Sequence, residues 1–231
     1  MAVDPIISDL QYVMETSQEL DILNFHKGFP ITCKGRVEHI ERDVVVLKVQ
    51  PPGSVCLESQ EQTILLSRGL PEAVKAQILS FDLVTGLLKI SDLNYVGSHF
   101  GERMIARVQP EEVIEVGIAV DGAHYTGTLV DVSLSGVGVF VKENVFQRGQ
   151  MLELTLPLPE GQVTLPGKVL SVTEAPEEQT RLSVGFTRNA QEIATVMRYI
   201  KDRRTEILTE VERMYERAYH SKLSQANDRS G

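Results

Sequence analysis

The chain has 231 residues, of which 42% are hydrophobic and 24% charged, a composition typical of folded globular proteins. This is enough apolar material for one large domain or two small ones, and it excludes a disordered chain, a collagen-like fibre and a disulfide-stabilised miniprotein. With 23 basic and 32 acidic residues the formal net charge is −9. No segment is broadly basic, which argues against nucleic acid or an anionic membrane as the main partner.

The sequence contains no signal for export or membrane insertion. No apolar run approaches the ~20 residues of a membrane-spanning helix, and no basic region precedes an apolar core at the N-terminus. The two cysteines, Cys33 and Cys56, are too few for a disulfide framework and lack a zinc-binding spacing. We therefore expect a cytoplasmic protein with reduced thiols and no membrane span.

Residues 1–96 predict a small β-barrel preceded by a short helix. Apolar residues recur at helical spacing over residues 5–20, and Asp4 before Pro5 is typical of a helix N-cap. The turn-forming sequence HKGFP then ends the helix. Between residues 31 and 91, short runs rich in Val, Ile and Leu are separated by turns that contain Pro or Gly, which indicates a small barrel or sandwich.

Residues 97–107 contain Gly97 and Gly101 and predict a hinge between two domains. Beyond it, alternating apolar residues predict about six strands between residues 112 and 187. Six antiparallel strands can close into a barrel that leaves no exposed edge. We assign this second barrel to residues 108–188.

Residues 189–222 predict a long C-terminal helix capped by Asn189, followed by a disordered tail over residues 223–231. Its stripe of mostly apolar positions alternates between spacings of four and three residues. The stripe consists of Ile193, Met197, Ile200, Arg204, Ile207, Val211, Met214 and Ala218. Such a stripe fits a homodimeric coiled coil and packing along the same chain equally well.

Signatures of catalysis are missing from the sequence. The five histidines are scattered without a metal-binding pair, and no Gly-x-x-x-x-Gly-Lys-Ser/Thr phosphate loop is present. We therefore expect neither an enzyme nor a metalloprotein, and no resident cofactor.

Two short motifs carry the functional prediction. The first is Arg103-Met104-Ile105-Ala106-Arg107, whose two guanidinium groups could converge on a phosphate or on the O6/N7 edge of guanine, or stack on a base. Alone, this pair is better explained as solvated arginines at the start of a strand.

The second motif is the segment from Asp131 to Gly136. Strand alternation would place Asp131, Ser133 and Ser135 on one face, where a carboxylate could accept the N1–H and N2–H groups of guanine and a hydroxyl could bind nearby. Gly136 would allow close approach of the backbone. Alone, this segment is better explained as a polar strand end followed by a turn.

Together the motifs are more specific. Arg-x-x-x-Arg, about 24 residues of strand-like sequence, and Asp-x-Ser-x-x-Gly resemble the PilZ family of cyclic di-GMP receptors, and residues 182–186 are similar to a late strand of that family. The resemblance covers roughly residues 100–200. The arrangement before it is similar to the two-domain, flagellar-brake type of PilZ protein. It implies a mainly β fold with an N-terminal split-barrel-like domain, a six-stranded PilZ barrel, a short N-terminal helix and a long C-terminal helix.

The resemblance also implies a site and a function. Arg103 and Arg107 would bind the phosphates and guanine edges of cyclic di-GMP from a loop that folds over the ligand, while Asp131, Ser133 and Gly136 would form the barrel side. Binding would change the interdomain geometry and thereby regulate a partner in the flagellar motor or a biosynthetic machinery, with motility, exopolysaccharide or biofilm as output. The alternative is a PilZ-like adaptor that acts through protein–protein contacts without nucleotide.

One position departs from the family. Many members have an arginine directly before the first motif, associated with capture of a stacked ligand dimer, and this chain has Glu102 there. A carboxylate beside a dianionic ligand is repulsive. We therefore expect one ligand per site.

Overall fold

A computed structural model of the chain describes residues 4–97, 106–143, 145–187 and 190–228. It forms two compact units. The first comprises Met1–His26, Pro30–Ile105 and Ile207–Gly231, and the second comprises Lys27–Phe29 and Ala106–Glu206. The division between residues 105 and 106 falls inside the segment predicted as a hinge.

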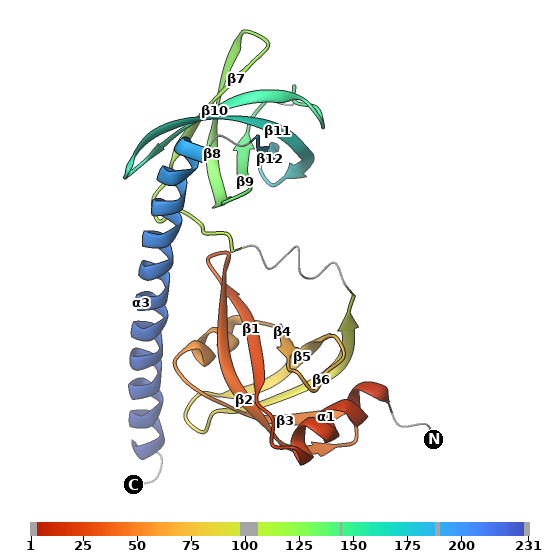
Figure 1. Cartoon of the computed structure of the whole chain (residues 1–231). Helices are drawn as coiled ribbons and strands as arrows, with labels where there is room; N and C mark the ends of the chain where they lie inside the picture. Colours follow the sequence, from red (N-terminus) through yellow and green to blue (C-terminus); the bar gives the residue numbers. More distant parts are fainter. Residues whose placement is uncertain (1–3, 98–105, 144, 188–189, 229–231) are drawn as a thin grey trace. The chain divides into compact units, whose positions relative to one another are not determined.

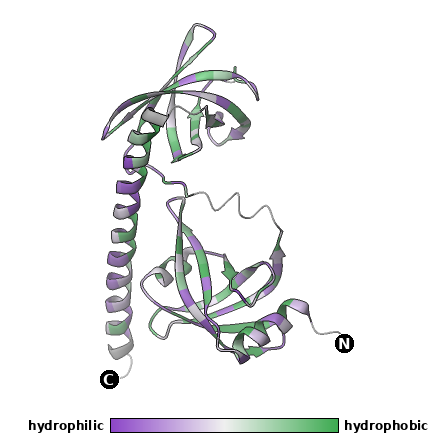
Figure 2. Cartoon of the chain, viewed as in Figure 1, coloured by the Kyte–Doolittle hydropathy of each residue, from purple (hydrophilic) through white to green (hydrophobic). Residues whose placement is uncertain are grey.

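The first unit is built around a closed barrel of six antiparallel strands (Figure 1). Its elements are α1 (Pro5–Glu15), β1 (Leu20–His26), β2 (Phe29–Glu41), β3 (Val44–Val49), a 3₁₀ helix η1 (Gly53–Ser59), β4 (Gln62–Leu66), β5 (Ala73–Asp82) and β6 (Leu87–Val96). The strand order is β1-β2-β3-β6-β5-β4. Hydrophobic and hydrophilic residues alternate along the strands (Figure 2), so that Ile22, Leu47 and Leu88 are fully buried in the barrel core.

Helix α1 is shorter than the sequence predicts. Asp4 caps it as expected, because its side chain accepts a hydrogen bond from the Ile6 amide at 2.9 Å. The helix ends at Glu15, since Ser17 adopts a left-handed conformation with φ of 53°. The expectation of helix to residue 20 was therefore wrong.

The segment Leu20–His26 is strand β1, which the sequence reading did not recognise. It pairs with β4 in antiparallel register and lies beside β2, so it is the strand that closes the barrel. The sequence HKGFP, expected to end the helix, instead contains the turn between β1 and β2.

The second unit contains the six strands that the alternation predicts. They are β7 (Glu115–Val120), β8 (Ala123–Ser133), β9 (Gly136–Val141), β10 (Met151–Leu158), β11 (Gly161–Ala175) and β12 (Gln179–Phe186). They close into an antiparallel barrel in the order β10-β11-β12-β9-β8-β7. Leu154, Leu165 and Leu182 are fully buried in its core. The mainly β fold with two barrels and two terminal helices is confirmed.

The C-terminal helix α3 (Ala190–Asp228) contributes residues to both units. Residues 223–228 are helical rather than part of a tail; Asn189 and residues 229–231 lie outside the described residues. Its first half buries Val196, Tyr199 and Arg203, whereas Met197 of the predicted stripe is 53% exposed. Further along the helix, Ile207 and Val211 of the predicted stripe are buried, so the buried face departs from the stripe only in the first half. In the part of the chain that the structure describes, no helix combines the length and apolar character of a membrane span.

Candidate functional site

The end of the first motif and the start of the second meet on the wall of the second barrel. Val108 forms an isolated antiparallel bridge with Val132 of β8, with both N–H···O distances at 3.0 Å. This bridge places the preceding residue, Arg107, beside Asp131. Arg107 Nη1 donates to Asp131 Oδ1 at 2.8 Å.

A second arginine, Arg181 of β12, binds the same carboxylate. Its Nη2 donates to Asp131 Oδ2 at 2.6 Å. The Asp131 side chain is only 8% exposed, whereas those of Arg107 and Arg181 are 44% and 41% exposed. A buried carboxylate is costly unless it is paired, and here each oxygen has its own guanidinium. The two guanidinium groups remain accessible to a ligand.

Gly138 makes the pairing between Arg181 and Asp131 possible. Strand β9 lies between β8 and β12, and its Gly138 is the register partner of both Asp131 and Ser183. A Cβ at Gly138 would lie 2.9 Å from Asp131 Oδ2 and 3.3 Å from Arg181 Nη2. The absent side chain therefore leaves the path across the middle strand open.

A register irregularity in β8 sets the direction of Asp131. The pairing with β9 shifts between Leu129 and Asp131, which adds one residue to β8 at this point. Beyond this point Asp131, Val132 and Ser133 pair in regular register with β9, and all three are buried. Leu134 and Ser135 form the turn, so the strand alternation expected for this segment does not extend to Ser135.

Ser133 and Gly136 shape the tight turn that joins β8 to β9. The fully buried Ser133 hydroxyl donates to the Gly136 carbonyl at 3.1 Å and accepts from the Ser135 amide at 3.3 Å. A Cβ at Gly136 would lie 2.1 Å from the Val184 carbonyl oxygen, so glycine is required for the approach of β9 to β12. Ser133 therefore holds the turn, and its hydroxyl is already engaged there.

The structure brings together Arg107 and Asp131 and places Ser133 and Gly136 in the adjoining turn. Arg103 and Glu102 lie outside the described residues. Sequence reasoning missed Arg181 and Gly138. The signal for Arg181 was a lone arginine directly before the late strand segment Leu182–Phe186, at a position where alternation directs side chains out of the barrel.

The chemistry of this face is that of a receptor for an anion with hydrogen-bond donors. Guanidinium groups bind phosphate oxygens in a planar fork and stack on bases, and a carboxylate accepts N–H groups. Among the described residues, no group of three or more His, Cys, Asp or Glu side chains could hold a metal ion.

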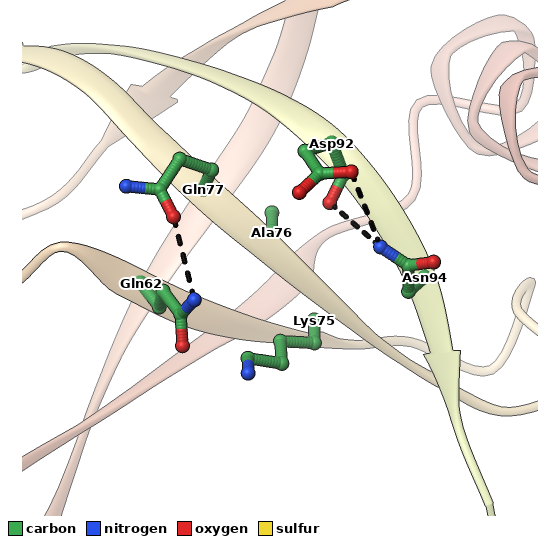
Figure 3. A pocket seen from close by; sticks show the side chains of 6 residues that line it. All are labelled: Gln62, Lys75, Ala76, Gln77, Asp92 and Asn94. Carbon is green, nitrogen blue, oxygen red and sulfur yellow. Dashed lines mark hydrogen bonds between the residues drawn. The ribbon is translucent and has the colours of Figure 1, made fainter.

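A separate hollow on the first barrel contains none of the predicted site residues (Figure 3). It is lined by Gln62, Lys75, Ala76, Gln77, Asp92 and Asn94 from β4, β5 and β6. Several of its polar groups bind one another: Gln62 Nε2 donates to Gln77 Oε1 at 3.3 Å, and Asn94 Nδ2 donates to the Asp92 carbonyl at 3.1 Å. The hollow is open and carries no recognisable chemistry.

Comparison with known proteins places the site within a known domain. Residues 102–202 match the family model of the PilZ domain. An uncharacterized protein of Aquifex aeolicus (strain VF5) is 28% identical over 130 residues, which cover 55% of this chain and 62% of the relative, so the match spans less than two thirds of that relative.

Three solved structures align with most of the chain at low sequence identity. The Bacillus subtilis inhibitor of motility MotI/DgrA is 13% identical, with a TM-score of 0.44 over 81% of this chain and 96% of that one. The K. pneumonia MrkH–c-di-GMP complex is 15% identical, with a TM-score of 0.43 over 92% and 96%. Escherichia coli YcgR in complex with c-di-GMP is 16% identical, with a TM-score of 0.38 over 99% and 94%.

Proposed function

We propose that this chain, whose residues 102–202 form a PilZ domain, is a receptor for cyclic di-GMP that regulates a partner protein. The observation that carries the proposal is the convergence of Arg107 and Arg181 on the buried Asp131. The arginine of the first PilZ-like motif and the acid of the second are in direct contact. The guanidinium groups of Arg107 and Arg181 remain partly exposed on the same face.

Each residue has a chemically matched role in this proposal. Arg107, together with Arg103, binds the phosphates and guanine edges, and Asp131 accepts the N1–H and N2–H groups of a guanine. Ser133 and Gly136 hold the turn that brings β9 against β12, so they shape the wall on which the ligand lies. Arg181 keeps the buried carboxylate paired while Arg107 turns toward a phosphate.

The charge of the ligand fits the site. Arg107, Arg181 and Asp131 together carry a net positive charge, which attracts a dianion. Glu102 precedes the first motif, and its carboxylate disfavours a second, stacked ligand. We infer a stoichiometry of one cyclic di-GMP per chain, and a calorimetric stoichiometry of two would overturn this inference.

The proposal is tested by titrating the full chain with cyclic di-GMP in a calorimeter. Each ion pair or stacking contact of this kind contributes about 1–3 kcal/mol, so Arg107→Ala weakens binding by about tenfold or more. Arg148→Ala, which removes an exposed arginine of the same unit, leaves the affinity unchanged. Cyclic di-AMP binds weakly, because adenine lacks the two N–H donors that Asp131 accepts.

The competing function is an adaptor that uses the PilZ barrel only for protein contacts. In that case the ion pairs of Asp131 are purely structural. Absence of heat with cyclic di-GMP, or equal affinities for the wild type and Arg107→Ala, would favour the adaptor.

We further infer that ligand binding changes the arrangement of the two units, and that this change regulates a component of the flagellar motor or of a biosynthetic machinery. One of the chain segments that join the units, at residues 105–106, carries the first arginine motif, so a ligand that binds this motif acts on that connection. Small-angle scattering with saturating cyclic di-GMP tests this inference. Profiles that are identical with and without ligand would contradict it.

A further inference from the structure

Helix α3 contains a buried arginine, Arg203, that has three polar partners. The Arg203 side chain is 3% exposed, and arginine is rarely so buried unless it is paired. Its Nη1 donates to Glu206 Oε2 at 2.8 Å, and its Nη2 lies 2.6 Å from Glu111 Oε2. Burial acts to lower the pKa of Arg203, but the hydrogen bond that Arg203 donates to Glu206 and the charge of Glu111 raise it overall, so the side chain remains charged.

The third partner of Arg203 is the backbone of the arginine-bearing segment. Arg203 Nε donates to the Gln109 carbonyl at 2.9 Å, and the Gln109 amide donates to the Lys27 carbonyl at 3.0 Å. Both backbone groups of Gln109 are therefore held by elements distant in sequence. With the bridge between Val108 and Val132, three consecutive contacts fix the chain directly after Arg107.

Glu111 links Arg203 to a second basic residue, Lys27. Its carboxylate lies 3.6 Å from Lys27 Nζ as well as against Arg203. The neighbouring Arg204 lies over the Phe29 ring at 5.5 Å from its centroid. These contacts connect three segments, which we call the junction: residues 27–29, 107–111 and 203–206.

We propose that Arg203 is a positioning residue for the nucleotide site, which holds the segment 107–109 so that the Arg107 side chain reaches Asp131 and the ligand. The part of the proposal that concerns the ligand rests on the proposed function. Arg203 acts on the site through the Gln109 backbone, which follows Arg107 by two residues. Because coupling between two positions is reciprocal, ligand bound at Arg107 also strengthens the contact between Gln109 and Arg203.

The first test needs no ligand. Arg203→Met keeps the buried stem of the side chain but removes every donor, and Arg198→Met is a matched control on the exposed face of the same helix. Loss of one hydrogen bond to a charged donor changes local opening by about tenfold. Amide exchange of Val108 and Gln109, followed by NMR in the free protein, therefore accelerates by about tenfold in Arg203→Met and is unchanged in Arg198→Met. Equal exchange in both variants would overturn the positioning role.

The second test separates positioning from general stability. We expect Arg203→Met to weaken cyclic di-GMP binding by about five- to tenfold in the wild-type background, and to have almost no further effect in the Arg107→Ala background. Arg203→Lys keeps the charge but cannot reach all three partners, so we expect its affinity for cyclic di-GMP to lie between those of the wild type and Arg203→Met. A loss caused by destabilisation alone would be the same in both backgrounds, and that result would overturn the proposal.

The two tests fail independently. If the wild type gives no heat with cyclic di-GMP, the proposed function is wrong, and amide exchange at Gln109 still decides whether Arg203 positions the segment. If the wild type binds cyclic di-GMP but Arg203→Met weakens binding equally in the wild-type and Arg107→Ala backgrounds, the proposed receptor function is retained and the positioning role is wrong.

Discussion

The two barrels have the same number of strands and the same antiparallel pairing, yet their walls differ in chemistry. The ion pairs on the first barrel, such as Lys34–Asp21 and Arg36–Glu19, join one exposed cation to one partly exposed acid, and such pairs contribute about 0–1 kcal/mol. On the second barrel, a single buried acid, Asp131, is shared by two arginines.

The difference teaches that the site does not follow from the barrel fold itself. It depends on one irregularity in β8, which lies directly before Asp131, and on Gly136 and Gly138 in the adjacent strand. These features bring chain positions 107, 131 and 181 together on one face. Four substitutions or treatments, in decreasing order of expected effect, test this contrast.

The largest effect is expected at Gly136, which contacts rigid backbone. Gly136→Ala places a Cβ 2.1 Å from the Val184 carbonyl oxygen, whereas Gly35→Ala on the first barrel places its Cβ 2.5 Å from the flexible end of Ile22. We expect Gly136→Ala to lower the free energy of unfolding by about 3 kcal/mol or more, and Gly35→Ala by clearly less. Urea denaturation measures both, and equal losses would contradict the geometry.

The next effect concerns the shared acid. Asp131→Asn removes the charge that holds two guanidinium groups and replaces one acceptor oxygen by a donor, so we expect about 100-fold weaker binding of cyclic di-GMP. Asp21→Asn makes the same change in an exposed pair of the first barrel and leaves the affinity unchanged. Calorimetry on both variants, with thermal melts to verify folding, decides the point; near-equal affinities would show that Asp131 does not bind ligand.

A smaller effect is expected for the arginine that the sequence did not reveal. Arg181→Gln leaves Arg107 to neutralise the buried Asp131 carboxylate, so Arg107 is less available to a phosphate. We expect about tenfold weaker binding, and no change for Arg36→Gln on the first barrel. An affinity of Arg181→Gln equal to that of the wild type would restrict Arg181 to a structural role.

The smallest effect is expected from the buried thiols of the first barrel. Burial raises the pKa of Cys33 to about 12 and that of Cys56 to about 11. Both thiols are therefore protonated at pH 8, and only the thiolate reacts quickly with disulfide reagents. We expect the native chain to react slowly at pH 8 and to react fully in urea, without any change in ligand affinity before unfolding. Rapid modification of the native chain would contradict the burial of these residues.

Much of the fold could be predicted from local sequence patterns. Alternation predicted all six strands of the second barrel, and the spacing of apolar residues predicted both terminal helices. Strand β1 was missed because residues 20–26 follow a helical pattern directly, and the left-handed Ser17 that ends α1 has no strong sequence signal. On α3, Arg203 was not expected to be buried, because two of its three partners, Gln109 and Glu111, lie more than 90 residues away in sequence.

The site could be predicted only in part for the same reason. Arg107 and Asp131 belong to the two short motifs that the sequence singles out, and the Val108–Val132 bridge joins them. The contact between Asp131 and Arg181 spans 50 residues and depends on the position of β9 between β8 and β12. Neither the strand order nor the clearance at Gly138 can be read from spacing.

The most direct test of this account is a crystal structure of the full chain with cyclic di-GMP. The account predicts one ligand on the β8–β9–β12 face, with a guanine N–H edge on the Asp131 carboxylate and Arg107 turned to a phosphate or a guanine edge. A ligand bound elsewhere, or one that leaves the Arg107–Asp131 contact unchanged and touches neither residue, would contradict it.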